Sequence, residues 1–292
     1  MDAEASRRKL WGIAYRVTGC AADADEIVQE SYARMLERRP DEGERPIEAW
    51  LVTVATRLSI DRLRRRRETP YDGPWLPSPV ETPDDESDGP DARLGAFEEA
   101  TFAYLMALEV LSPEQRAALV LRDVFELPAR EAGAVLGVTE DNIRALHHRA
   151  RARLSDAGEL PAVGPDARRR TEAALQAFFA CVIAGDAAGA LRLLRDDACT
   201  YNDGAGVYHA ARRPVHGADR VVRLWLGLMH KRGAPSAVAL VTINGLPALD
   251  ARFDDGDPKD APRSITGGWL APDGRIATLY AVLAPRKLAH LG

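Results

Sequence analysis

The sequence predicts a multidomain chain in which two all-α domains are followed by an α+β domain. Apolar residues recur at the i, i+3 and i+4 spacing of amphipathic helices over residues 1–67 and 93–157. Glycine and proline cluster in residues 68–92 and again before residue 166, and such clusters mark boundaries. Within residues 166–292 a helix is expected first, and short apolar runs then alternate with turn residues, as strands do. A length of 292 residues allows two or three compact domains.

Composition indicates a globular protein, with 46% hydrophobic and 6% aromatic residues. No apolar run approaches the roughly 20 residues that span a bilayer, and the charged N-terminus lacks the apolar core of a signal peptide. We therefore expect a cytoplasmic protein with no membrane partner. Cys20, Cys181 and Cys199 are isolated, which argues against a disulfide framework or a cysteine-based metal site.

The segment 68–92 is expected to be an extended linker. Eight prolines and glycines interrupt any helix within it, and its second half is acidic, which favours mobility. Trp75 and Leu76 are apolar residues in this polar setting, so they need a surface on which to be buried.

The pattern from Pro46 predicts a long helix over residues 46–67 with one apolar face. The opposite edge carries Thr53, Arg57, Asp61 and Arg64, and an arginine run to residue 67 follows. Clustered arginines favour phosphate binding through counterion release. The same run could instead complement the helix macrodipole.

Residues 112–154 predict a helix-turn-helix. Ser112 and Gln115 have capping-box spacing, a short helix is expected over Ala129–Leu136, Gly137 suits a turn, and Thr139 can cap the next helix.

That last helix has one apolar side and one exposed polar side. The exposed side carries Arg144, His147, His148 and Arg151. Long donors on one face are what a recognition helix needs, although a solvated cationic face would look the same. Adjacent histidines point about 100° apart, so the zinc interpretation is poor and no metal site is expected.

The segment Ala24–Glu37 predicts a helix with an acidic face. Its apolar positions, which end at Leu36, should face a core. Glu26, Gln29 and Glu30 share the opposite face. An acidic face predicts a partner other than DNA. A solvated face that binds no partner would have the same pattern.

Together these segments resemble the extracytoplasmic-function sigma factors. Residues 23–34 (DADEIVQESYAR) resemble the part of sigma region 2 that binds the β′ coiled coil of RNA polymerase. Residues 49–64 (AWLVTVATRLSIDRLR) resemble the helix that reads the −10 promoter element, and residues 111–154 are similar to region 4, which reads the −35 element.

The resemblance implies core RNA polymerase and promoter DNA as partners, no cofactor and no catalysis. It assigns polymerase binding to Asp25, Glu26, Gln29 and Glu30. It assigns −10 contacts to Arg57, Asp61, Arg64 and Arg65. It assigns −35 contacts to Thr139, Arg144, His147, His148 and Arg151.

Three further segments resemble the SigJ-like subgroup, which carries a fused SnoaL-like (nuclear transport factor 2-like) domain. They are YDGPWLPSP at residues 71–79, DGAG at residues 203–206 and APRKLAHL at residues 284–291. The resemblance implies a cone-shaped α+β domain with an apolar pocket that regulates the sigma regions by contacting them. The implied regulatory residues are Trp75, Leu76, Asp203, Gly204, Gly206, Lys287 and Leu288. We expect Trp75 and Leu76 to dock near residues 203–206 and 286–291.

Departures and alternatives accompany this resemblance. Ala205 replaces a glycine of the subgroup motif, Ser78 replaces a usual glutamate, and Ala132 replaces a larger apolar residue. One alternative is a DNA-binding regulator that never contacts polymerase. The other is an enzyme whose pocket uses a carboxylate, histidine or tyrosine, with Tyr201, Asp203, Tyr208, His209 and Trp269 as the residues to consider. We also expect a monomer when the protein is free, and an unidentified small ligand.

Overall fold

The computed structural model describes residues 3–37, 46–82, 101–156, 160–161, 164–254 and 256–292. The chain divides into two compact units. The helical unit contains residues 1–70, 86–100 and 104–159, and the C-terminal unit contains residues 71–85, 101–103 and 160–292. No helix in the described ranges is long and apolar enough to cross a membrane.

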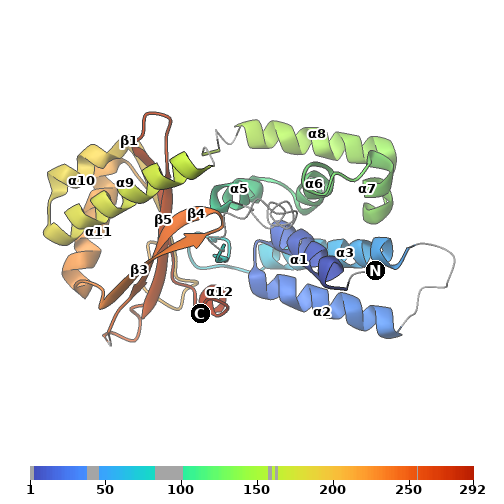
Figure 1. Ribbon diagram of the computed structural model, residues 1–292, viewed down its shortest axis with the longest axis horizontal. Helices are drawn as coiled ribbons and strands as arrows, with labels where there is room; N and C mark the ends of the chain where they lie inside the picture. Colours follow the sequence, from blue (N-terminus) through green and yellow to red (C-terminus); the bar gives the residue numbers. More distant parts are fainter. Residues whose placement is uncertain (1–2, 38–45, 83–100, 157–159, 162–163, 255) are drawn as a thin grey trace. The chain divides into compact units, whose positions relative to one another are not determined.

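The first part of the helical unit is a bundle of α1 (Ala3–Thr18), α2 (Ala21–Glu37) and α3 (Ile47–Glu68), labelled in Figure 1. Its core is made of apolar side chains with 3% or less exposure from all three helices, including Leu10, Ile13, Ile27, Val28, Leu51 and Leu63. The expectation that Leu36 faces this core is wrong, because its side chain lies in the last turn of α2 and is 76% exposed.

The second part contains the predicted helix-turn-helix. In chain order its elements are α5 (Phe102–Ala107), the 3₁₀ turn η1 (Leu108–Val110), α6 (Pro113–Leu119), the π turn η2 (Val120–Val124), α7 (Ala129–Leu136) and α8 (Glu140–Asp156). The capping box at the start of α6 is confirmed, since Ser112 Oγ accepts from Gln115 N and Gln115 Oε1 accepts from Ser112 N. Gly137 ends α7 with φ of 72°, the left-handed geometry that favours glycine.

The C-terminal unit is α+β. Its helices are α9 (Pro165–Ala184), α10 (Ala187–Leu193), α11 (Ala218–Arg232) and α12 (Pro285–Leu288). Its strands are β1 (Leu194–Asp203), β2 (Val215–His216), β3 (Ala237–Ile243), β4 (Leu246–Arg252), β5 (Arg263–Leu270) and β6 (Ile276–Val282). They form one sheet in the order β2-β1-β6-β5-β4-β3, in which only the β1–β6 pair is parallel.

Helices α9, α10 and α11 cover one face of this curved sheet (Figure 1). The core between helices and sheet includes Leu175, Phe178, Val182, Val221, Ile276 and Leu279. Side chains of α9, α11 and the sheet also line the cavity described below.

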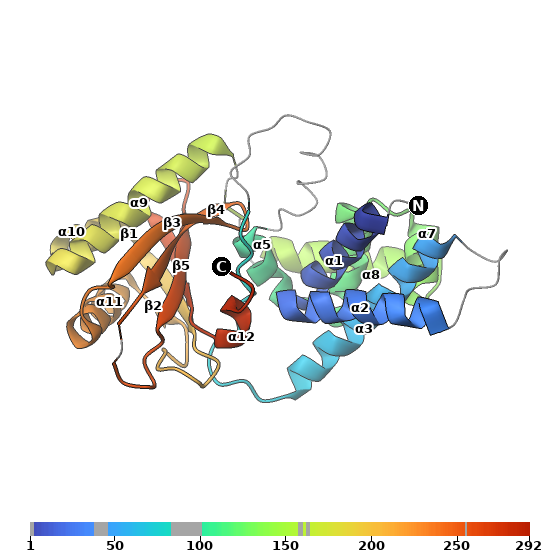
Figure 2. The ribbon, with the colours of Figure 1, turned by 60° about the horizontal axis from the view of Figure 1, so that its bottom comes forward.

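Residues 71–82, here called the strap, pack on the C-terminal unit and pass beside α12 (Figure 2). At the far end of the strap, Thr82 N donates to Thr242 O at 2.9 Å and Asn244 N donates to Val80 O at 2.8 Å. The strap is thus the first half of the expected linker. The acidic half, residues 83–92, lies outside the described residues.

Candidate nucleic-acid interface and linker clamp

The exposed edge of α3 carries the residues expected at the −10 element, and two of them bind the helix-turn-helix half of the same unit. Arg57 Nε donates to Val135 O at 3.3 Å. Arg64 Nη2 lies 2.6 Å from Glu114 Oε1. Asp61 and Arg65 are exposed, and Arg65 Nε donates to the carbonyl of Asp61 at 3.3 Å.

The rest of the arginine run surrounds Glu109. Arg66 Nη2 lies 2.5 Å from one oxygen of Glu109, Arg116 pairs with the other, and Arg67 donates to the Glu109 carbonyl at 3.1 Å. Burial acts to raise the pKa of Glu109, but Arg116 and Arg66 outweigh it, so the pKa lies below its usual 4.5. Carboxylates of the second half of the unit therefore pair with Arg64 and Arg66, whereas Arg57, Arg65 and Arg67 donate to backbone carbonyls.

Helix α8 presents the residues expected at the −35 element. Thr139 Oγ1 accepts from Asn142 N at 3.3 Å, as a cap should. Arg144 pairs with Glu140 and Asp141 of its own helix.

Of the other expected −35 residues on α8, two lie near the carboxylate of Asp123 and one faces solvent. His147 Nε2 lies 2.5 Å from Asp123 Oδ1, and Arg151 lies 3.6 Å from the same carboxylate. His148 is exposed. His147 is therefore held against η2, whereas Arg144, His148 and Arg151 remain on the open side of the helix.

The face expected to bind polymerase lies along α2. Asp25 accepts from Trp11 Nε1 at 2.9 Å, Glu26 pairs with Arg62 at 2.8 Å, and Glu30 pairs with Arg34 at 2.5 Å. Gln29 is exposed. These contacts hold the carboxylates at the surface instead of burying them.

In the C-terminal unit, Asp203 and Lys287 bind Tyr71, Trp75 and Leu76 of the strap. These five residues are here called the linker clamp. One oxygen of Asp203 accepts from Tyr71 Oη at 2.6 Å, and the other accepts from Leu76 N at 2.9 Å and Lys287 Nζ at 2.6 Å. Lys287 also donates to the Leu76 carbonyl and lies 4.1 Å from the centre of the Trp75 ring. Asp203 is fully buried and Lys287 is 6% exposed, so both charges depend on these partners.

The turn after Asp203 explains the two glycines of the motif. A Cβ on Gly204 would lie 2.5 Å from the Tyr208 carbonyl oxygen, and Gly206 has φ of 71°. Ala205 occupies the same left-handed region with φ of 51°, and its N–H donates to Asp203 Oδ1 at 3.0 Å. Leu288, on α12 beside Lys287, is 7% exposed.

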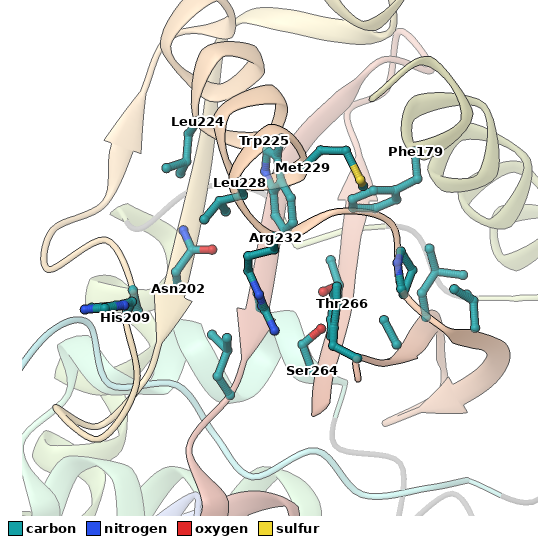
Figure 3. Close-up of a pocket in the computed structure, with 18 of the residues that line it drawn as sticks. Phe179, Asn202, His209, Leu224, Trp225, Leu228, Met229, Arg232, Ser264 and Thr266 are labelled. Carbon is teal, nitrogen blue, oxygen red and sulfur yellow. The ribbon is translucent and has the colours of Figure 1, made fainter. Parts of the chain in front are cut away.

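A cavity of about 380 Å³ opens between α9, α11 and the sheet (Figure 3). Of the five residues considered for catalysis, His209 lines it, whereas Tyr201, Asp203, Tyr208 and Trp269 do not. His209 Nδ1 lies 3.1 Å from Asp260 Oδ1. No aspartate, glutamate or tyrosine is among the described lining residues. In the part of the chain that the structure describes, no group of three His, Cys, Asp or Glu side chains could hold a metal ion.

Several residues of the candidate interface and of the cavity were not predicted from the sequence. Glu109, Glu114 and Asp123 pair with cations of the expected DNA-binding faces, and Asn202 and Arg232 line the cavity. Glu114 lies in the first turn of α6, next to the capping-box residues. An acidic residue there commonly stabilises the helix macrodipole, so its position did not predict a contact with Arg64. The others carry no local pattern.

Two helical regions, one presenting an arginine-bearing helix and the other a helix-turn-helix, define a promoter-recognition protein. The model of Sigma-70 region 2 matches residues 3–69, and that of Sigma-70 region 4 matches residues 101–154. The chain is 39% identical to the ECF RNA polymerase sigma factor SigJ of Mycobacterium tuberculosis, over 97% of this chain and 91% of the relative. It therefore belongs to the extracytoplasmic-function RNA polymerase sigma factors.

Two further similarities agree with this family. The crystal structure of Mycobacterium tuberculosis SigJ superposes with a TM-score of 0.76 at 33% identity, covering 98% of this chain and 96% of that one. SigE of Mycolicibacterium smegmatis is 35% identical over 51% of this chain and 56% of its own length. The expected fold class, two all-α regions followed by an α+β domain, is confirmed, and the protein acts with RNA polymerase in transcription initiation at promoters.

Proposed function

We propose that the fused C-terminal domain regulates this sigma factor by controlling the linker between its two promoter-reading regions. In this proposal residues 1–67 act as region 2, residues 68–92 as the linker, residues 93–157 as region 4 and residues 166–292 as the regulatory domain. Arg57, Asp61, Arg64 and Arg65 contact the −10 element. Thr139, Arg144, His147, His148 and Arg151 serve the −35 element. Asp25, Glu26, Gln29 and Glu30 contact polymerase, in the cytoplasm.

The observation that carries the proposal is the closed arrangement of the helical unit. Arg64 of α3 pairs with Glu114 of region 4 at 2.6 Å. Promoter elements at −10 and −35 are separated by roughly 25 base pairs, or about 85 Å along B-DNA. A unit with region 4 directly on α3 cannot read both elements, so the regions must separate before the promoter is bound.

The closed arrangement also occupies two arginines of α3. Glu114 pairs with Arg64, and Glu109 pairs with Arg66. A carboxylate in this position competes with a DNA phosphate for the same guanidinium. Opening the unit therefore exposes charge that favours DNA, and polymerase shifts the equilibrium by binding the open state better.

The C-terminal unit holds the chain at both ends of the linker. Helix α3 ends at Glu68, and the clamp takes up the chain at Tyr71. At the start of α5, inside the range assigned to region 4, Phe102 stacks on Tyr280 with ring centres 3.9 Å apart. In this proposal, these two contacts with the regulatory domain determine how far region 2 and region 4 can move apart.

We further propose that the regulatory domain is not catalytic. Its cavity offers one titratable acid–base side chain, His209, among the described lining residues. Asp260 lies 3.1 Å from His209 Nδ1, but the described lining residues include no carboxylate or tyrosine that could act on a bound substrate as a second acid or base.

Run-off transcription with core polymerase tests the regulatory proposal. Full-length protein is compared with residues 1–160 and with the full-length Lys287→Met variant. Higher activity of both altered proteins supports inhibition through the clamp. Lower activity of both identifies the clamp as a required part of the initiating complex. If Lys287→Met matches the wild type while the truncation differs, the domain acts by a route other than the strap, which contradicts the proposal.

A further inference from the structure

The cavity of the C-terminal unit is apolar on most of its wall. Side chains of α9, α11, β3 and β4 line it, including Phe179, Leu224, Leu228, Met229, Val238 and Leu249 (Figure 3). A volume of about 380 Å³ is within the range of sites that enclose a small organic molecule.

One part of the wall carries hydrogen-bond donors that have no protein acceptor. Asn202 is 4% exposed, and its Nδ2 has no hydrogen-bond partner among the described residues. Trp225 Nε1, in the same wall, is likewise buried without an acceptor in the described part of the chain. Leaving a buried donor unpaired is costly, so these groups favour a ligand that brings an acceptor.

Arg232 gives this part of the wall a positive charge. Its guanidinium projects into the cavity in Figure 3, stacks on Phe253 at 3.9 Å from the ring centre and donates one hydrogen bond to the Ala261 carbonyl. Burial lowers the pKa of Arg232, although Asp260 opposes this shift.

Asp260 is already in contact with two other side chains, His209 and Lys231. Its Oδ1 atom lies 3.1 Å from His209 Nδ1 and 3.7 Å from Lys231 Nζ. No ion pair to Arg232 is found within the described ranges, so its charge is available to a ligand.

We propose that this cavity binds an apolar organic anion, with the hydrocarbon part against α9 and α11 and the acidic head group at Arg232 and Asn202. A carboxylate or sulfonate oxygen accepts from the guanidinium and from the Asn202 amide, which satisfies the donor that the protein leaves unpaired. The binding site stands independently of regulation. Only its link to transcription, described next, rests on the proposed function.

Strand β1 connects this cavity to the linker clamp. Asn202 lines the cavity, and the next residue, Asp203, is the centre of the clamp. Successive strand side chains point to opposite faces, so one strand carries both sites. The loop after β1 also contributes His209 and Ala210 to the cavity wall. In this proposal, a bound anion that shifts this loop also moves Asp203 and weakens or strengthens its contacts with the strap.

The test uses two fluorescent probes that share one aromatic skeleton. 8-Anilinonaphthalene-1-sulfonate is anionic, and N-phenyl-1-naphthylamine is neutral. Titrated into the full chain, the anionic probe is expected to bind at least about tenfold more tightly, because a charge-assisted contact adds to the shared apolar burial. Equal affinity, or tighter binding of the neutral probe, overturns the proposal.

Three variants locate the site. Arg232→Gln should weaken the anionic probe about tenfold and leave the neutral probe unchanged. Arg223→Gln, which removes the same charge from an exposed position of the same helix, is the matched control and should change neither. Ala251→Phe fills the cavity and should displace both probes.

Thermal unfolding of each variant, followed by circular dichroism, separates loss of the site from loss of the fold. A native melt of Ala251→Phe with unchanged probe binding places the probes elsewhere and contradicts the proposal. If Ala251→Phe unfolds, Asn202→Leu replaces it: a folded Asn202→Leu protein should lose anion preference, and retained preference overturns the assignment. Run-off transcription with and without the anionic probe then tests coupling separately, since binding without a transcriptional effect leaves the site intact and contradicts only the regulatory link.

Discussion

Lys287 Nζ lies 2.6 Å from Asp203 Oδ2, and both side chains are almost completely buried. The ammonium also binds the Leu76 carbonyl, so this ion pair holds the first half of the strap on the C-terminal unit, together with the Tyr71 contact to Asp203. A buried charge pair adds little net stability over an apolar pair, but removing one member leaves the other uncompensated. Replacing a single member of the pair should therefore be enough to release the strap.

Replacing Lys287 with methionine should release the strap. The variant leaves the Asp203 carboxylate buried without its cation, so we expect the free energy of unfolding to fall by about 3 kcal/mol. Limited proteolysis within residues 71–82 should become faster. Lys259→Met makes the same substitution at an exposed position of the same unit, and as the matched control it should behave like the wild type. In the double variant Asp203→Asn/Lys287→Met, part of the loss should be recovered, and strictly additive losses would show that the two groups act independently.

Glu109→Gln should open the helical unit. The pKa of Glu109 is lowered in the folded protein, so its stabilisation is fully present above the ordinary value of 4.5 and is lost as pH falls through the lower folded value. We expect the variant to be less stable by about 2 kcal/mol at pH 7, because Arg66 and Arg116 lose their carboxylate. Between pH 5 and pH 3 its stability should then fall less than that of the wild type.

Chemical denaturation across this pH range measures both effects. Glu131→Gln, on the exposed side of α7, is the control and should show the wild-type pH dependence. An acid dependence of Glu109→Gln as steep as that of the wild type would mean that other carboxylates govern the closed state.

Arg144→Ala should weaken promoter binding by the complex with core polymerase. Arg144 lies on the open side of α8, where its partners Glu140 and Asp141 belong to its own helix. Loss of one base or phosphate contact typically costs about 1–3 kcal/mol, which is tenfold or more in affinity. Affinity for core polymerase should not change. Arg195→Ala removes one charge from β1 of the regulatory domain and serves as the control. Equal weakening by both variants would indicate a nonspecific charge effect.

Ala205→Gly should stabilise the C-terminal unit. Ala205 has φ of 51°, a conformation that costs a residue with a Cβ about 1 kcal/mol relative to glycine. The substitution also restores the glycine of the subgroup motif. We expect a higher thermal midpoint with unchanged strap protection, because the Ala205 N–H bond to Asp203 does not need the methyl group. A lower midpoint would show that the methyl packs favourably enough to offset the strain.

Local patterns in the sequence predicted most elements of the fold. The helix over Ala129–Leu136 and the capping box at Ser112 are found where they were expected, and strands follow a first helix within residues 166–292. Periodicity, caps and turn residues act within a few positions along the chain, so a single sequence contains them. The family resemblance added the order of the regions and indicated which residues gather at the strap.

The pairing partners depended on tertiary structure. Arg64 and Glu114 are 50 positions apart, and Arg66 and Glu109 are 43 positions apart. No periodicity relates residues at such separations, because their approach depends on how whole helices pack.

The class of protein, the order of its domains and the chemical character of each exposed face could thus be predicted before the structure was known. Only the tertiary structure decided that α3 arginines meet region 4 carboxylates, that Asp203 holds Tyr71, Leu76 and Lys287, and that Asn202 and Arg232 line one cavity. The physical reason is that local patterns encode which side of an element is buried, whereas packing of distant segments determines which groups meet there.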